Sequence, residues 1–551
     1  ALQEAGKWPE ADARIARLSD ERLLGHLQAQ RYLHPTAYRS RYAELQHWLS
    51  HYADHPQARR IYRLALKRRP KGAAAPRRPV EPSRPYAGLG AVASEPARSG
   101  KALSRAERRE ANRLKRQVRR NVLRTRLTIT EDLLERPRTR ELLDRVERDE
   151  AYSEVAAAWF YSGRDDKAYA LADGAARRSG AEVPLAHWIA GLAAWRQNRL
   201  PEAAGHFERL AESPRASGWN VAAGAYWAAR ACLRLRAPAE TSRWLRIAAE
   251  HPHTFYGVLA RRALGLRPHL EPASAELAPE LIARLEAVPA GARALALLQV
   301  GQRELAETEL ARIAGDLRPE TAAGLLALAE RARLPALAFR LAQRLAGLGT
   351  AGPEGSLDRG LIEAALYPIP PWRPRGGFQI DRALLFAMMR QESGFNPAAK
   401  SPDGARGLMQ LMPSTAGYIA RDRAFRWSKR WKLFEPETNL ELGQRYIAHL
   451  LDQSAVGGDL FRLAAAYNGG PGNLNKWQRR MNFHDDPLLF IESLPSRETR
   501  LFIERVLTNL WIYRARLGQP APSLDGIAAG DWPLYVSQDD DTAELASHEP
   551  N

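Results

Sequence analysis

Apolar and polar residues recur at helical spacing through the first 350 positions, and almost no strand-like alternation interrupts them. From residue 150 onward, segments repeat a helix, a turn near an arginine and an alanine-rich second helix. This pattern predicts helix hairpins that bury their apolar faces against one another and stack into a superhelix. The arginines that mark the turns are Arg164, Arg199 and Arg236, with weaker copies around Arg303 and Arg333.

Aromatic residues inside these repeats are regularly placed, as Trp159 and Trp195 illustrate. Regular placement predicts core packing, although exposed aromatic rings in such a body would be candidate sugar platforms. Cys232 occupies a corresponding repeat position, so we expect a small buried hydrophobe and no nucleophile there. Because it is the only cysteine, a disulfide scaffold is excluded.

The proline-rich stretch 368–377 separates this body from a segment of different character. Asp381 can cap a helix that contains Leu384 and Met388 and that ends at Gly394. Glu392 therefore falls in the last turn of an apolar helix, where burial and the negative helix end both disfavour the carboxylate. A carboxyl that stays protonated near neutral pH suits general acid catalysis, whereas the alternative is an ordinary surface glutamate.

Charge is concentrated in one region. The 551 residues carry a formal net charge of +19, and residues 59–126 alone hold 22 basic and four acidic side chains. Residues 69–100 read as a proline- and arginine-rich linker, and 102–126 as a charged helix that begins with an S-x-x-E capping box. Either a solvated helix or a contact with a polyanion explains this charge. Specific nucleic-acid recognition is not expected, because no zinc-finger, RNP or basic-zipper pattern accompanies it.

Other chemistries lack their motifs. The chain contains no Walker A loop, no H-E-x-x-H and no C-x-x-C, so we predict no cofactor and no metal site. The G-x-G-x-x-G at Gly347, Gly349 and Gly352 lacks the strand that precedes a dinucleotide loop, and it predicts a loop at a domain boundary. The sequence contains no run of 18 apolar residues, so it predicts no membrane-spanning helix.

Four blocks after residue 377 occur in a fixed order: RQESGFNPAAKSPDGARGLMQLMP, AAAYNGGPG, ESLPSRETR, and VLTN followed by YR. Together they resemble the catalytic domain of the soluble lytic murein transglycosylases, a lysozyme-like fold related to goose-type lysozyme. The resemblance implies a mainly α protein in which an α-superhelix precedes a lysozyme-like α+β domain. It also implies cleavage of the β-1,4 bond between N-acetylmuramic acid and N-acetylglucosamine in peptidoglycan, with a 1,6-anhydro product.

The resemblance assigns the single catalytic acid and base to Glu392 and a hydrogen bond to that acid from Ser401. The further substrate-binding residues that it implies are Gln410, Met412, Tyr467, Asn468 and Glu498. The chain departs from the family pattern at three positions, where it has Gly469, Ser496 and Phe502.

These observations predict six segments: N-terminal hairpins over 1–68, the basic segment 69–126, the repeat body 127–350, a linker over 351–377, the catalytic domain 378–520, and a flexible tail over 521–551. The expected partners are peptidoglycan strands, with other cell-wall enzymes as candidates, and the expected location is the periplasm after removal of a signal peptide. A goose-type hydrolase, a non-catalytic glycan-binding scaffold and a nucleic-acid binder that uses the basic segment remain as alternatives.

Overall fold

The computed structural model describes residues 2–81, 100–266, 277, 279–316, 319–347 and 359–539. Contacts divide the chain into two compact units, each built from two separate stretches of sequence. The first unit combines residues 1–91 with 270–371, and the second combines 92–269 with 372–551.

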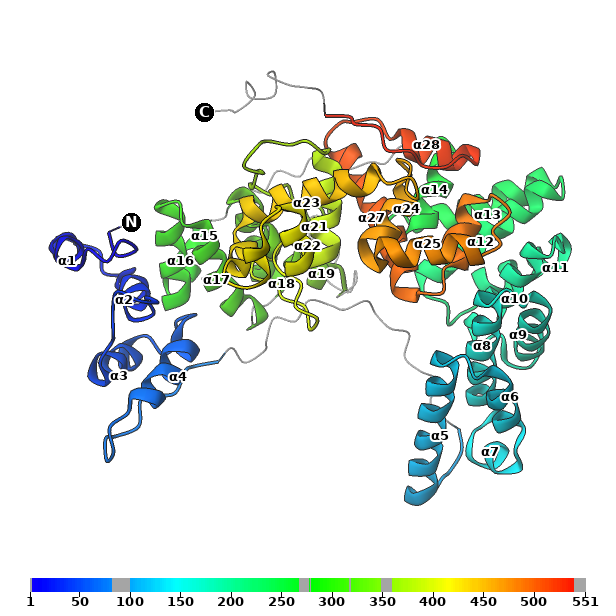
Figure 1. Ribbon diagram of the computed structural model, residues 1–551, viewed down its shortest axis with the longest axis horizontal. Coiled ribbons are helices and arrows are strands. Elements are labelled where there is room, and N and C mark those ends of the chain that lie inside the picture. The colour runs from blue at the N-terminus through cyan, green and yellow to red at the C-terminus, as the bar shows by residue number, and fades with distance from the viewer. Residues whose placement is uncertain are drawn as a thin grey trace. The chain divides into compact units, whose positions relative to one another are not determined.

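The first unit is helical throughout its described part (Figure 1). Its two hydrophobic clusters centre on Trp48 and Ile61 near the amino terminus and on Leu325 and Leu341 in the later helices. Its helices are α1 Trp8–Ile15, α2 Leu24–Tyr32, α3 Tyr42–His51, α4 Ala58–Arg68, α15 Pro279–Glu286, α16 Pro289–Gln299, α17 Arg303–Ile313, η1 Ala314–Asp316, α18 Pro319–Arg331, α19 Pro335–Gly347 and α20 Arg359–Ala365.

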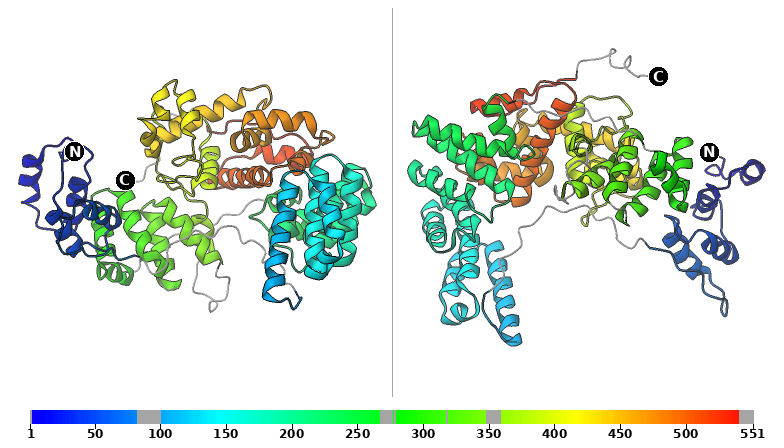
Figure 2. Two further views of the ribbon diagram at one scale, coloured as in Figure 1. Left: turned by 60° about the horizontal axis from the view of Figure 1, so that its bottom comes forward. Right: turned by 180° about the vertical axis from the view of Figure 1, so that it is seen from behind.

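The second unit begins with a stack of helix hairpins, in which neighbouring helices from α8 to α13 lie side by side (Figures 1 and 2). These helices confirm the predicted stack of hairpins. The helices of this part are α5 Arg105–Leu123, α6 Leu127–Glu135, α7 Pro137–Leu142, α8 Arg145–Tyr161, α9 Asp165–Ser179, α10 Pro184–Arg196, α11 Leu200–Ala211, α12 Gly218–Arg234, α13 Pro238–Ala249 and α14 Phe255–Ala263.

The hairpin turns correct the register of the predicted repeat. Two positions after each first helix ends, the chain has a residue with positive φ, and these residues are Gly163, Asn198 and Arg236. Arg164 and Arg199 follow that position, whereas Arg236 occupies it. The repeat marked by the arginines is therefore out of register by one residue in its third copy. Such a turn tolerates arginine because the left-handed conformation costs only about 1–2 kcal/mol.

The aromatic residues of the hairpins pack largely as predicted. Trp195, Trp227 and Phe207 are buried and contact one another with ring centroids 5.1–5.6 Å apart. Cys232 is buried, and this burial raises the pKa of its thiol, which makes it a poor nucleophile.

The second unit continues with a compact domain in which α21 packs against α27 (Figure 2). In place of a sheet, the described part of this domain has isolated antiparallel bridges, two of them joining Arg406 to Lys400 and to Leu411. The mainly helical prediction is confirmed. The elements are α21 Arg382–Ser393, α22 Pro413–Ile419, η2 Arg423–Arg426, η3 Arg430–Phe434, α23 Pro436–Leu451, α24 Leu460–Gly469, α25 Pro471–Arg480, α26 Pro487–Ser493, α27 Arg497–Arg516 and α28 Pro522–Ala529.

The described part of the predicted tail is folded. Residues 522–529 form α28, and the backbone beyond it pairs with the loop before α24, where Leu460 N donates to Pro533 O at 2.9 Å. Asp539 N donates to the carboxylate of Asp381 at 3.2 Å. The polar composition of this segment concealed these backbone contacts. Residues 540–551, the segment 82–99 and the Gly349–Gly352 part of the glycine motif lie outside the described residues.

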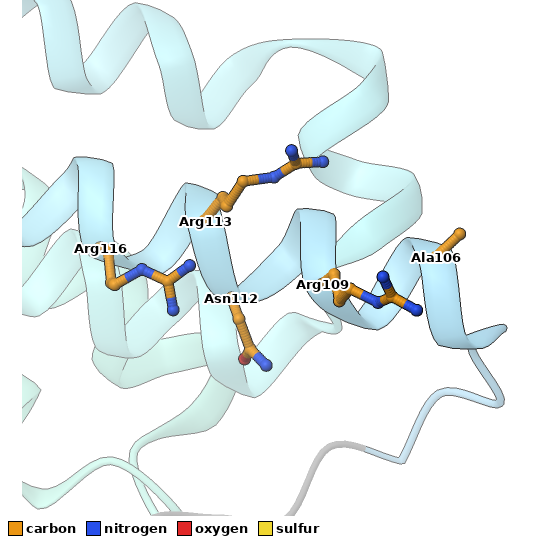
Figure 3. Close-up of a pocket in the computed structure, with 5 residues that line it drawn as sticks. All are labelled: Ala106, Arg109, Asn112, Arg113 and Arg116. Atoms are coloured by element: carbon orange, nitrogen blue, oxygen red, sulfur yellow. The ribbon is translucent and has the colours of Figure 1, made fainter.

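Helix α5 carries the densest charge. Its Ser104 capping box forms as predicted, and Ala111 and Val118 face the protein. Its opposite face is exposed and lines an open hollow of about 430 Å³ (Figure 3), formed by Ala106, Arg109, Asn112, Arg113 and Arg116. Within the described ranges, no helix combines the length and apolar character needed to cross a bilayer.

Candidate active site

Glu392 lies in the last turn of α21, as predicted. The apolar residues of that helix, from Ala383 to Met389, are all buried, and the helix ends at Gly394 with φ 55°. A left-handed residue at this position favours glycine and stops the helix directly after the candidate acid. The buried helix therefore fixes the position of Glu392, while its side chain stays partly accessible to solvent.

Burial raises the pKa of Glu392 to about 8, and the negative charge of Glu498 adds to the rise. Among the described residues, none donates a hydrogen bond or forms an ion pair to the Glu392 carboxyl that would offset this burial. Because the cost of burying the charge is not repaid, the carboxyl is mostly protonated at pH 7.

Tyr467 lies next to Glu392, near the end of α24. Burial raises its pKa well above the usual value, and the charge of Glu392 contributes to the same shift. The Tyr467 hydroxyl donates to Met409 O at 2.7 Å, and its ring stacks on Phe502 with centroids 6.3 Å apart and planes 7° apart. Phe502 therefore supports the tyrosine ring through its own ring.

The Asn468 side chain connects Tyr467's helix to the start of α27. Its amide nitrogen donates to Glu498 at 3.5 Å, and its amide oxygen accepts from the Thr499 hydroxyl at 2.8 Å. The glycine at position 469, one of the departures from the family pattern, has a structural reason. A Cβ there would lie 2.6 Å from the Trp477 ring. The predicted glycine and proline loop is shorter than expected: Gly470, with φ 85°, separates α24 from α25.

The remaining predicted residues lie on the turn that joins Lys400 to Leu411. Ser401 Oγ accepts from Ala405 N at 3.0 Å, and within the described residues it makes no hydrogen bond to Glu392. Gln410, with φ 44°, donates to Gly407 O at 2.7 Å and to Ala399 O at 3.2 Å. Met412 is 38% exposed. The contact of Tyr467 with Met409 joins this turn to α24.

Asn439 is a supporting residue that sequence reasoning missed. It is fully buried in α23, where its amide oxygen accepts from Met409 N at 2.8 Å. Its amide nitrogen donates to Arg406 O at 2.9 Å and to Leu433 O at 2.8 Å. A polar residue at an inward position of α23 is the signal that could have revealed it.

Two buried carboxyls were also missed. Glu492 accepts from the Tyr256 hydroxyl at 2.5 Å, and Glu504 accepts from Trp219 Nε1 at 2.6 Å. Burial raises the pKa of Glu492, and burial with the nearby Glu492 charge raises that of Glu504 to about 8. These contacts tie α26 and α27 to the helical hairpins. The two partners of each contact are more than 200 positions apart in the sequence, so no local sequence pattern indicates these contacts.

One group of side chains in the first unit has the composition of a metal site. Potential ligand atoms of His26, His55 and Glu309 all lie within 4.8 Å of one another. However, both Glu309 oxygens accept from Arg293, at 2.7 and 2.9 Å, and His55 Nδ1 accepts from Gln57 N at 3.1 Å. A histidine that binds metal through Nε2 must donate from Nδ1, so this donor set fits an ion-pair network better than a divalent cation.

These observations define a lysozyme-like domain with one sheltered carboxyl at the end of a buried helix. Residues 374–490 match the family model for the transglycosylase SLT domain. The soluble lytic murein transglycosylase of Escherichia coli strain K12 is 36% identical over 161 residues, which cover 29% of this chain and 24% of that protein. Its Salmonella typhimurium counterpart is 38% identical over 144 residues, or 26% and 22% of the two chains. The resemblance stated from the motifs is therefore confirmed.

Solved structures extend the likeness in fold. The lytic transglycosylase Slt of Pseudomonas aeruginosa matches with a TM-score of 0.55 at 19% identity, and the match covers 97% of this chain and 87% of that one. A 70-kDa soluble lytic transglycosylase in complex with bulgecin A matches with a TM-score of 0.54 at 18% identity, over 97% and 98% of the two chains. At this identity the likeness shows the fold alone. In sequence, the chain matches about a quarter of the length of its curated relatives.

Proposed function

We propose that this chain is a lytic transglycosylase that cleaves the β-1,4 bond between N-acetylmuramic acid and N-acetylglucosamine in peptidoglycan. The observation that carries the proposal is Glu392, a mostly protonated carboxyl held rigidly at the end of a buried helix inside a domain that matches the SLT family. The soluble lytic murein transglycosylases among its relatives support the same substrate.

Glu392 is sheltered yet partly open to solvent, whereas the buried Glu492 and Glu504 are hydrogen-bonded to Tyr256 and Trp219. One available carboxyl favours a reaction in which the substrate supplies the nucleophile. An ordinary glycosidase places a second carboxylate across the bond as nucleophile or base. Asp403 is exposed on its turn, and Glu498 is exposed at the start of α27, where Asn468 contacts it. Neither shares the shelter of Glu392, so we assign Glu498 to substrate binding.

The mechanism then uses Glu392 twice. It first donates its proton to the glycosidic oxygen, and the bond between that oxygen and C1 of the muramic acid breaks. The oxocarbenium-like C1 is stabilised by the N-acetyl group of the same sugar. The Glu392 carboxylate next takes the proton of the C6 hydroxyl, whose oxygen attacks C1 and closes the 1,6-anhydro ring. No water enters the product, and the proton returns to Glu392.

The neighbouring residues have supporting roles in this proposal. Tyr467, held by Met409 and Phe502, limits water beside Glu392 and fixes one wall of the site. Asn468 and Glu498 present polar groups to the sugar, and Ser401, Gln410 and Met412 line the turn on the other side. The Ser401 hydroxyl accepts from Ala405 N, and a hydroxyl can donate its own proton to another acceptor at the same time.

The mass of the released muropeptides tests the reaction. Digestion of purified sacculi should give products about 18 Da lighter than hydrolytic ones, since hydrolysis adds a water molecule and closure of the anhydro ring does not. Products with the hydrolytic mass would instead indicate a goose-type lysozyme activity. Failure to release dye from labelled sacculi would favour a non-catalytic glycan-binding protein.

The expected partners follow from the substrate. We propose that peptidoglycan strands are the ligand and that the protein acts in the periplasm, where this polymer lies. Fractionation of cells that produce the protein natively tests the location, and recovery in the cytoplasm would contradict it.

A further inference from the structure

The segment between α22 and α23 carries an unusual combination of side chains. Residues 421–432 read RDRAFRWSKRWK, with six cations and one acid. The acid, Asp422, is occupied because Lys429 Nζ lies 2.7 Å from it and Ala424 N donates to it at 2.9 Å. The described residues place no carboxylate within ion-pair distance of the remaining exposed arginines. We call these arginines, together with the two exposed tryptophans of the segment, the basic-aromatic ledge. Its residues are Arg421, Arg423, Arg426, Trp427, Arg430 and Trp431.

The two tryptophans of the ledge face water. Trp427 is 74% exposed and Trp431 is 57% exposed. Leaving such large apolar rings in water forgoes the favourable burial of apolar surface. Single exposed apolar residues are common, but two large rings among unpaired cations mark a binding surface.

The exposure is not a consequence of a loose segment. Phe425 and Leu433 from the same stretch are buried and anchor η2 and η3. Leu433 O accepts from the buried Asn439, which also holds Arg406 O and Met409 N. Gly407 lies so close that a Cβ would meet Leu433 O at 2.0 Å. The ledge is therefore fixed to the same turn that carries Gln410 and contacts Tyr467.

The chemistry of the ledge selects its occupant. Aromatic faces pack against the apolar face of a pyranose ring, and guanidinium groups bind carboxylates through paired hydrogen bonds. A neutral glycan requires no cations, and a simple polyanion requires no rings. We propose that the basic-aromatic ledge is an accessory binding surface for peptidoglycan, in which the tryptophans contact the sugars and the arginines contact the carboxylates of the stem peptides.

This inference rests on the proposed function for its choice of polymer, and binding without turnover tests it separately. In an E392Q background, the double variant W427A/W431A should sediment with purified sacculi about tenfold more weakly than E392Q alone, since two aromatic contacts are lost. R426Q/R430Q should weaken binding several-fold on intact sacculi and much less on glycan stripped of its peptides. The matched control is R109Q/R116Q on α5, which removes the same charge elsewhere and should leave binding unchanged.

The possible outcomes distinguish a peptidoglycan-binding ledge from the alternative explanations. Equal binding by the ledge variants and E392Q would overturn the ledge, even if the parent enzyme releases anhydro products. Equal losses in R109Q/R116Q and R426Q/R430Q would also overturn it, because they would indicate unspecific charge attraction. Stronger ledge-dependent binding to single-stranded DNA or to anionic vesicles than to sacculi would reassign the surface. Ledge-dependent binding by a parent chain that cleaves nothing would keep the ledge and remove the enzyme.

Discussion

Helices α5 and α21 use charge in opposite ways. The arginines of the 19-residue α5 are exposed to water. Its two glutamates have partners, since Glu107 belongs to the Ser104 capping box and Glu110 pairs with Arg138 at 2.7 Å. The 12-residue α21 is buried through most of its length and carries one carboxyl at each end. Net charge is therefore a poor guide to chemistry here, and the position of a single carboxyl is a better one.

The two ends of α21 sharpen this contrast. Asp381, at the amino-terminal end, accepts from Arg514 at 2.8 Å and from Ser537 at 2.8 Å. Glu392, at the carboxy-terminal end, has no such donor among the described residues, and its pKa rises to about 8. The pair of Asp381 and Arg514 stabilises the domain, whereas the unpaired Glu392 is the proposed proton donor. The predictions test this division, starting from the largest effect.

Replacing the unpaired acid should have the largest effect. E392Q should reduce the turnover of sacculi by about 10²–10⁴-fold, because the amide can neither donate the proton nor accept it later. Release of soluble muropeptides measures turnover. D403N, an exposed carboxyl on the nearby turn, is the matched control and should retain activity. Wild-type rates in E392Q would remove Glu392 from catalysis.

Removing the Asp381 carboxylate from its ion pair with Arg514 should lower the stability of the fold. D381N leaves Arg514 buried without its charge partner, which should lower the free energy of unfolding by about 3–5 kcal/mol. Denaturant titration measures the loss. The exposed pair Arg262 and Asp525 provides the control, since D525N should cost less than about 1 kcal/mol. Equal losses in both variants would contradict the distinction between the two pairs.

The raised pKa of Glu392 should appear in the pH dependence. The proton donor is the neutral form, so activity persists below about pH 8 and falls as pH rises through that value. E498Q removes a negative charge that disfavours the carboxylate, so the falling limb should move to lower pH. The rate of sacculus cleavage between pH 6 and 10 measures the position of the limb. A limb that moves to higher pH in E498Q would contradict the sign of this coupling.

The same shift has a stability consequence. A folded-state pKa above the usual value of about 4.5 means that the free energy of unfolding falls between that pH and about pH 8. E392Q does not titrate, so it should be more stable than the parent at pH 8 and should lose this advantage near pH 4. Thermal unfolding at both pH values checks the difference, and a constant offset would argue against a buried titrating group.

Much of this contrast was predictable from sequence. The apolar spacing before Glu392 and the glycine after it predicted a buried helix that ends at the acid, and the structure has both. Asp381 was predicted as a helix cap, yet its side chain makes no capping bond and pairs with Arg514. That pair joins residues 133 positions apart, so only tertiary packing reveals it. The third hairpin turn does contain Arg236, as predicted, but only the structure shows that this arginine adopts a conformation that glycine usually supplies.

The smallest expected effect concerns the arginine face of α5. Arg109 and Arg116 have like-charged neighbours three or four residues away, and these form five pairs with Arg105, Arg113, Arg119 and Arg120. Like charges at this spacing destabilise a helix by about 0.2–0.5 kcal/mol for each pair. R109Q/R116Q should therefore raise the free energy of unfolding by about 1–2.5 kcal/mol at low salt. At 0.5 M salt the gain should vanish, because exposed charges are then screened over a few ångströms. A loss of stability that persists at high salt would show that these arginines contact the fold, and α5 would then resemble α21 more closely than its exposure indicates.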